Sequence, residues 1–181
     1  ACADCHDPET MNLRITRVTL LNALEVRGID PNQLSRQEMR TMVCAQCHVE
    51  YHFADDNKKV TYPWKYGLTA NDAEKFYDEI NFKDWNHGET GAPMLKAQHP
   101  DYELFSTGVH AANGVACADC HMPYVKQGTS KISSHHLQSP LNTIAESCQT
   151  CHRQSEEYLK NQVINIQDKV FATRQVLEQA L

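Results

Sequence analysis

Apolar residues recur at the three- and four-residue spacing of α-helices along much of the chain. Residues 17–27 follow this spacing, and Gly28 is placed to end their predicted helix. Polar capping signals predict three further helix starts, at residues 35–38, 71–74 and 139–140. The pattern breaks at residues 53–69, which we interpret as a loop with one short strand near residues 60–62. The predicted fold is mainly α, with little regular β-structure.

The most regular apolar pattern follows Ser155. Seven positions alternate at spacings of four and three residues, which are Leu159, Val163, Ile166, Val170, Thr173, Leu177 and Ala180. Such a seam packs one long helix against another, in the same chain or in a second subunit. A helix of about 26 residues spans about 39 Å. We therefore predict a domain at residues 1–154 and the start of a long packing helix at residues 155–181, and we expect the natural chain to continue beyond both ends.

Composition and charge narrow the possible classes of protein. The apolar share of the 181 residues is 41%, or about 36% once the eight cysteines are set aside, which is below the ordinary globular share. Side chains alone would therefore build a thin core. The net charge is −6 and basic runs are lacking, which argues against a nucleic-acid partner. The longest apolar stretches fall short of the roughly 18 residues that a membrane-spanning helix needs.

All eight cysteines belong to one pattern, Cys-x-x-Cys-His, that occurs four times. The four sets are Cys2, Cys5 and His6; Cys44, Cys47 and His48; Cys117, Cys120 and His121; and Cys148, Cys151 and His152. This pattern is the attachment signature of c-type haem. On one helical turn the three residues share a face, so two thioether bonds can hold the porphyrin while the imidazole points at the iron. We predict four covalently bound haem c groups, which sit on helices or helix ends and form the core.

Disulfides and zinc sites are the alternatives for these cysteines. A disulfide framework does not explain a histidine after each second cysteine, and a zinc site needs ligands that converge from two segments. The motif starts are separated by 42, 73 and 31 residues, so the motifs do not form a regular repeat. Because c-type haem is attached outside the cytoplasm, the motifs predict the bacterial periplasm or an extracellular face, and of these we expect the periplasm.

Six histidines lie outside the motifs and are candidates for a second axial ligand: His52, His87, His99, His110, His135 and His136. His110 and His135 are the best candidates by position, because each lies in a connector that flanks a haem motif. Pro100 favours an extended backbone at His99, which suits a side chain presented to a pocket. Spacing alone gives no role to Glu50, Tyr51 or His52.

Three stretches carry a resemblance to a known family. They are CAQCHVEY at residues 44–51, MLKAQHP at residues 94–100 and CADCHMP at residues 117–123. They resemble the pentahaem cytochrome c nitrite reductases, which reduce nitrite to ammonium. The resemblance covers essentially the whole chain and implies that it corresponds to haems two to five of that family. The family's Cys-x-x-Cys-Lys motif for the catalytic first haem and its active-site arginine do not occur in these 181 residues.

The resemblance also implies roles for individual residues. Tyr51 and His99 match the catalytic tyrosine and histidine, which hydrogen-bond the bound nitrogen oxide and supply protons. His135 and His110 match distal ligands, and we place them over the haems of the first and fourth motifs respectively. A calcium site is matched by the side chains of Glu50 and Gln98 and the backbone carbonyls of Tyr51 and Lys96.

The implied activity is the six-electron reduction of nitrite to ammonium, with four electron-transfer haems on this chain. The resemblance further implies an electron donor, either a partner cytochrome or a quinol-oxidising protein, and a homodimer formed through the C-terminal helix. Two alternatives stay open, namely a self-contained tetrahaem electron-transfer cytochrome and part of an octahaem nitrite reductase.

Overall fold

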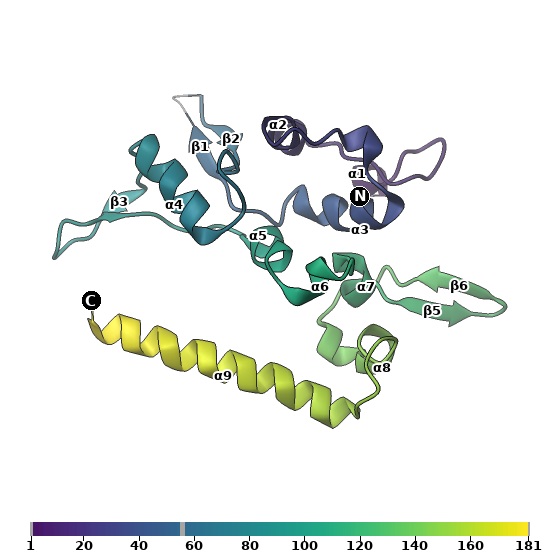
Figure 1. Ribbon diagram of the computed structural model, residues 1–181. Helices are drawn as coiled ribbons and strands as arrows, with labels where there is room; N and C mark the ends of the chain where they lie inside the picture. The colour runs from purple at the N-terminus through teal and green to yellow at the C-terminus, as the bar shows by residue number, and fades with distance from the viewer. Residues whose placement is uncertain (1, 55–56, 181) are drawn as a thin grey trace. The chain divides into compact units, whose positions relative to one another are not determined.

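The computed structural model describes residues 2–54 and 57–180, which fold as two compact units at residues 1–116 and 117–181 (Figure 1). Helices dominate the described residues and the strands are short, as the sequence predicts. The sequence analysis divides the chain elsewhere, into a haem-carrying domain at residues 1–154 and a packing helix at residues 155–181. That division stays a prediction.

The helices of the first unit begin and end largely where the sequence signals lie. They are α1 (Cys2–Cys5), α2 (Val18–Val26), the 3-10 helix η1 (Pro31–Gln33), α3 (Arg36–Ala45), α4 (Ala70–Glu79), α5 (Asp101–Ser106) and α6 (Val109–Ala112). Gly28 follows α2 with a φ of 68°, a conformation that glycine adopts without steric cost. The predicted capping box of α3 is confirmed, because the side chains of Ser35 and Glu38 each accept a hydrogen bond from the other's backbone N–H.

The start of α4 lies slightly earlier than the sequence signal. Its N-cap is Thr69 and not Asn71, because Thr69 and Asp72 form the reciprocal capping box. In the second unit the predicted cap at Ser139 is confirmed, since its side chain accepts from the N–H of Leu141 at the start of the 3-10 helix η2 (Pro140–Asn142).

Three short antiparallel pairs make up the described β-structure. They are β1 (His52–Ala54) with β2 (Lys59–Thr61), β3 (Trp85–Asn86) with β4 (Pro93–Met94), and β5 (Tyr124–Gln127) with β6 (Ser130–Ser133). The strand expected near residues 60–62 is confirmed as β2, one residue earlier. The loop interpretation of residues 53–69 is wrong for β1, because a three-residue strand is too short to show an alternating pattern. Residues 55 and 56 lie outside the described residues.

The first unit has a core of its own. Trp64 is almost fully buried, and its ring packs against Tyr62 and Tyr102 with centroid separations of 5.1 Å in both cases. The rest of the cluster comes from α2, α3 and the segment after it, and consists of Leu20, Ala23, Leu24, Met42, Ala45 and Val49. This core anchors the segment that carries the second haem motif.

The second unit contains α7 (Cys117–His121), the β5–β6 hairpin, η2, α8 (Ile144–Ser147) and α9 (Glu156–Ala180). The hairpin extends from the end of α7 (Figure 1). Among its described residues, those classed as buried are Ala118, Pro123, Ile144 and Ser147. Side chains therefore give this unit very little core.

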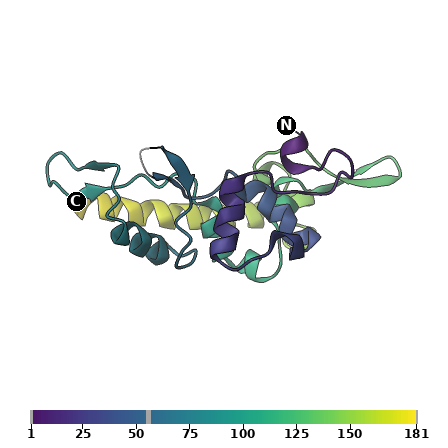
Figure 2. The same ribbon diagram turned by 90° about the horizontal axis from the view of Figure 1, so that it is seen from above.

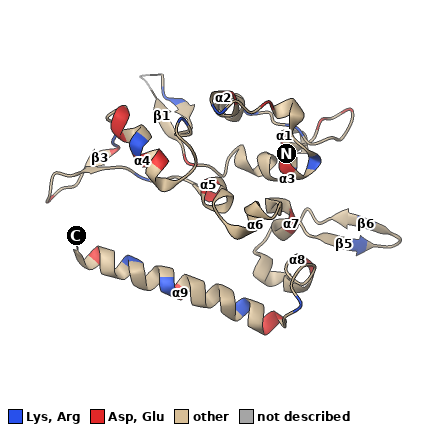
Figure 3. Ribbon diagram, in the orientation of Figure 1, with Lys and Arg blue, Asp and Glu red and all other residues tan. Residues whose placement is uncertain are grey.

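The predicted long helix is confirmed as α9, one uninterrupted helix of 25 residues (Figure 1), part of which is seen from above in Figure 2. Acidic and basic residues are spread along its length (Figure 3). The described side chains of the predicted seam are open to solvent to a large extent, with exposed fractions of 61% for Ile166, 64% for Val170 and 60% for Leu177. Neither α9 nor any other helix in the described part of the chain combines the length and apolarity needed to cross a bilayer.

Candidate functional site

Each Cys-x-x-Cys-His motif folds as one helical turn. The backbone N–H of the histidine donates to the carbonyl of the first cysteine in three motifs, with N···O distances of 2.9 Å for His6 and Cys2, 3.0 Å for His48 and Cys44, and 2.9 Å for His152 and Cys148. The third motif lies within α7. This turn places the two cysteines and the histidine on one side, as thioether attachment requires. Disulfides are absent among these eight described cysteines, so no disulfide competes with thioether attachment.

Three motif histidines are oriented through Nδ1. The Nδ1 of His6 lies 2.8 Å from the carbonyl of Met11, and that of His121 lies 3.1 Å from the carbonyl of Gln138. His48 instead contacts the carboxylate of Asp101 at 2.9 Å. These oxygens only accept, so the proton of each ring resides on Nδ1 and the lone pair on Nε2. Iron-ligating histidines are held in this way, so the motif residues fit a haem group.

The histidines outside the motifs differ in how their rings are held. The Nδ1 of His135 donates to the carbonyl of Ser133 at 3.0 Å, which leaves Nε2 as the ligand atom, as in the motifs. The Nδ1 of His87 accepts from the backbone N–H of Thr90 at 3.3 Å, so the neutral ring carries its proton on Nε2. This contrast favours His135 over His87 as a ligand. His110 lies on α6, and the assignment of His135 and His110 to particular haems stays a prediction.

Within each unit the two motifs lie close together. Burial raises the pKa of the Cys5 thiol, with smaller contributions from Asp4 and from Cys47 of the second motif. Burial likewise raises the pKa of the Cys120 thiol, and Cys148 of the fourth motif adds the next largest effect. Two hydrogen bonds give the geometry, one from Gln46 in the second motif to the carbonyl of Asp4 in the first, and one from Ser147 beside the fourth motif to the carbonyl of Cys120 in the third. The motifs therefore form two neighbouring pairs.

The structure brings the two predicted catalytic side chains together. The ring centroids of Tyr51 and His99 are 6.4 Å apart with an interplanar angle of 33°, and His99 lies equally far from the imidazole of His48. Tyr51 is half-buried and His99 is exposed. His99 therefore lies near both Tyr51 and the imidazole of the second haem motif.

One of the predicted calcium residues, Glu50, is a buried carboxylate. Glu50 is 5% exposed, and its two oxygens accept from the hydroxyl of Tyr77 and from the backbone N–H of Gln98. Burial raises the pKa of Glu50, and among the described residues neither lysine nor arginine forms an ion pair with it. The backbone N–H of Lys96 donates to Asp84, which fixes the same segment. A buried carboxylate without a cation fits a hard cation such as Ca²⁺.

Sequence reasoning missed two residues that hold Glu50 and His48 in place, Glu103 and Asp101. Glu103 is buried, and its Oε1 accepts from the backbone N–H of Glu50 at 3.0 Å and from the indole N–H of Trp64 at 2.6 Å. Asp101, which holds His48, lies in the same first turn of α5. Asp101 and Glu103 follow a His-Pro pair and are typical of a helix start. Their partners His48 and Glu50 lie 53 residues away in the sequence, so no local pattern reveals them.

The zinc alternative has no geometric support. Within residues 2–54 and 57–180, groups of three or more His, Cys, Asp or Glu side chains that could hold a metal ion are absent. The calcium candidates are not such a group, because Glu50 is the one carboxylate among them.

Helical Cys-x-x-Cys-His turns with oriented imidazoles define a c-type cytochrome. A comparison with family models agrees, since the cytochrome c552 model matches residues 1–181. The chain belongs to the cytochrome c552 family.

Relatives and a solved structure extend the comparison. The chain is 53% identical over 180 residues to a cytochrome c-552 of Porphyromonas gingivalis and 54% identical over 180 residues to one of Bacteroides thetaiotaomicron. Both alignments cover 99% of this chain, which spans 36% of either relative. The catalytic subunit of a cytochrome c nitrite reductase from Desulfovibrio desulfuricans, which has two calcium sites, matches with a TM-score of 0.88 and 41% identity. That match covers 95% of this chain and 39% of the neighbour.

Proposed function

We propose that this chain is part of a cytochrome c nitrite reductase that forms ammonium. The observation that carries the proposal is the proximity of His99 to both Tyr51 and His48, within a chain that presents four haem-attachment turns. Its 41% identity to the Desulfovibrio desulfuricans enzyme supports the same reaction. Bound haem supplies the redox chemistry, and four haems on these motifs would carry electrons.

The chain's own residues have defined tasks in this proposal. Tyr51 and His99 donate hydrogen bonds to the oxygens of nitrite and deliver protons as the nitrogen is reduced. Glu50 and Gln98, with the carbonyls of Tyr51 and Lys96, hold Ca²⁺ and so fix the segment from which Tyr51 projects. Electrons come from a donor cytochrome or a quinol-oxidising protein in the periplasm, where c-type haem is attached.

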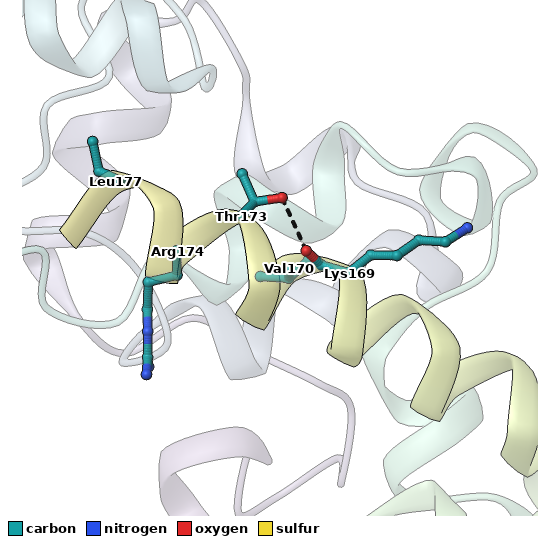
Figure 4. A pocket seen from close by; sticks show the side chains of 5 residues that line it. All are labelled: Lys169, Val170, Thr173, Arg174 and Leu177. Carbon is teal, nitrogen blue, oxygen red and sulfur yellow. Dashed lines mark hydrogen bonds between the residues drawn. The ribbon is translucent and has the colours of Figure 1, made fainter. Parts of the chain in front are cut away.

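We further propose that α9 forms a homodimer with a second copy. A shallow depression on α9 is lined by Lys169, Val170, Thr173, Arg174 and Leu177, and Thr173 and Leu177 project from the same side of the helix (Figure 4). The hydroxyl of Thr173 donates to the carbonyl of Lys169. The hydrogen-bonding potential of this hydroxyl is thereby used within α9, and its methyl group remains for apolar contact. An exposed apolar seam on a 25-residue helix is typical of a helix that packs on another.

The decisive experiment uses the full-length protein from a host that attaches c-type haem. Intact mass counts the haems, and ammonium formation from nitrite with a reduced donor measures turnover. Tyr51→Phe and His99→Ala should each lower turnover at least tenfold with unchanged haem content, about 1.4 kcal/mol or more in the barrier. Tyr66→Phe is the matched control, because Tyr66 is a partly exposed tyrosine whose hydroxyl bonds Glu79.

The outcomes of this experiment separate the candidate functions. A colourless protein at its bare polypeptide mass would refute haem attachment. A haem-loaded protein without turnover would favour a tetrahaem electron carrier. The gene sequence separates a pentahaem from an octahaem reductase, because the former predicts a single further motif, Cys-x-x-Cys-Lys, roughly 35 to 45 residues before Cys2.

A further inference from the structure

Gln46 joins the first two haem motifs. It lies inside the second motif and is 6% exposed. Its Nε2 donates to the backbone carbonyl of Asp4, inside the first motif, at 3.1 Å. Its Oε1 accepts from the backbone N–H groups of Thr16 at 2.6 Å and Arg17 at 3.0 Å, in the loop between the motifs. One buried amide therefore connects both attachment turns and the chain that links them.

Ser147 makes the corresponding connection in the second unit. It directly precedes Cys148 of the fourth motif and is 7% exposed. Its hydroxyl donates to the backbone carbonyl of Cys120, inside the third motif, at 2.9 Å. The Oγ1 of Thr143 lies 3.0 Å from the same hydroxyl and can donate to it, which leaves the proton of Ser147 for Cys120.

The two connections share a design although the residues differ. In each unit a buried side chain at the later motif donates to a main-chain carbonyl inside the earlier motif. The atoms that are joined belong to the turns that would carry the thioether bonds and the iron ligands. A displacement of one turn against the other would therefore move one haem against its neighbour.

We propose that Gln46 and Ser147 are positioning residues that fix the separation and orientation of the two haems in each pair. The interaction between two charged redox centres falls with distance, so these bonds set how strongly each haem shifts its neighbour's reduction potential. The inference rests on the haem attachment of the proposed function and is independent of nitrite reduction.

The test compares variants of the full-length, haem-loaded protein. Gln46→Leu removes the first bridge and Ser147→Ala removes the second. Spectroelectrochemical titration and electron paramagnetic resonance report the potentials and the magnetic coupling of the haems. We expect Gln46→Leu to change the coupling of the first pair only, and Ser147→Ala that of the second pair only. The matched control is Gln149→Leu, because Gln149 lies inside the fourth motif but is exposed and donates to the carbonyl of Gln154 nearby.

Conservative variants separate positioning from general stability. Ser147→Thr keeps the hydroxyl and should restore the coupling of the second pair. Gln46→Glu keeps an acceptor for Thr16 and Arg17 but, as a carboxylate, loses the donor to Asp4, so it should disturb the first pair as Gln46→Leu does. Should Gln46→Leu fail to load haem, Gln46→Glu decides the question.

Two results would overturn the inference. The first is unchanged coupling in both pairs when the variants carry their full haem content. The second is an equal disturbance of both pairs by either variant, which would indicate general loosening. A natural protein without haem would overturn this inference together with the proposed haem attachment, whereas a haem-loaded protein that lacks nitrite turnover would leave this inference standing.

Discussion

Glu103 connects two segments on which the candidate site of Glu50, Tyr51 and His99 depends. Its Oε1 accepts from the backbone N–H of Glu50 and from the indole of Trp64, while its Oε2 is buried without a hydrogen-bond partner among the described residues. The carboxylate therefore ties α5 to Glu50, the residue that precedes Tyr51 in the chain. Its value lies in satisfying two buried donors, and it does not require a negative charge.

We expect Glu103→Leu to lower the free energy of unfolding by about 3 kcal/mol, because it leaves two buried N–H groups without an acceptor at about 1–3 kcal/mol each. Glu103→Gln keeps an acceptor oxygen and should cost about 1 kcal/mol. Urea titration of the haem-loaded protein measures both. Equal losses for the two variants would contradict this role for the oxygen.

Calcium binding can be tested at Glu50. Glu50→Gln removes the negative charge and keeps the shape, so Ca²⁺ affinity should fall at least tenfold, or about 1.4 kcal/mol. Isothermal titration calorimetry after chelator treatment measures the affinity. Glu79→Gln is the control, since Glu79 is a solvent-exposed acid that pairs with Lys65. Similar Ca²⁺ affinities in both variants would place the cation elsewhere.

At the scale of the element, the capping box of α3 makes a pH-dependent contribution to the free energy of unfolding. Hydrogen bonds from the Ser35 hydroxyl and backbone lower the pKa of Glu38 below its usual 4.5. A carboxyl group whose pKa is lower in the folded protein stabilises the fold at pH values above its pKa in the unfolded chain. This stabilisation is lost as the pH falls through the pKa of the folded protein. We expect Ser35→Ala to lower the free energy of unfolding by about 1 kcal/mol at pH 7.

The control is Glu38→Gln, which keeps the reciprocal bond but does not titrate. Unfolding measured at pH 7 and at pH 3 should show a smaller effect of Ser35→Ala at the lower pH. The same comparison in a Glu38→Gln background should show no such change. An effect of Ser35→Ala that is independent of pH in both backgrounds would contradict the assignment.

The exposed seam of α9 predicts a dimer that a charge can weaken. Val170→Asp places a carboxylate in the seam and should raise the dimer dissociation constant at least tenfold, about 1.4 kcal/mol. Gln175→Asp adds the same charge on the opposite side of α9 and should have little effect. Analytical ultracentrifugation measures both, and equal dissociation constants for the two variants would exclude the seam as the interface.

Sequence alone predicted the elements whose signals are local. The helical turn of each haem motif, the box at Ser35 and the glycine after α2 all depend on residues within about five positions of one another. Two hydrogen bonds join residues that are far apart in the chain: the one between His48 and Asp101, and the one that the hydroxyl of Tyr77 donates to Glu50. Only the fold places such residues together. The sequence therefore identified the candidate site residues but not Asp101 and Glu103, which hold His48 and Glu50 in place.

At the scale of the whole molecule, the two units differ in what holds them together. The first has a cluster of aromatic and aliphatic side chains around Trp64, whereas the second buries few side chains of its own. Stability scales with the apolar surface removed from water, so the second unit needs another source of buried surface. Haem on the third and fourth motifs would supply it.

We expect a Cys117→Ser, Cys120→Ser double variant to unfold the second unit selectively. Backbone amides of α7 and α8 should exchange with deuterium at least tenfold faster, while those of α2 change little because their core is made of protein. Hydrogen exchange with mass spectrometry measures both regions. Equal acceleration in both units would show that their stabilities are coupled.

The scarcity of buried side chains in the second unit also bears on the life of the protein in the cell. A polypeptide that lacks an interior until a pigment is attached is a substrate for quality-control proteases during that interval. If haem is attached as proposed, the abundance of this protein should therefore follow the supply of iron, and iron starvation should deplete it after translation, with the messenger RNA unchanged.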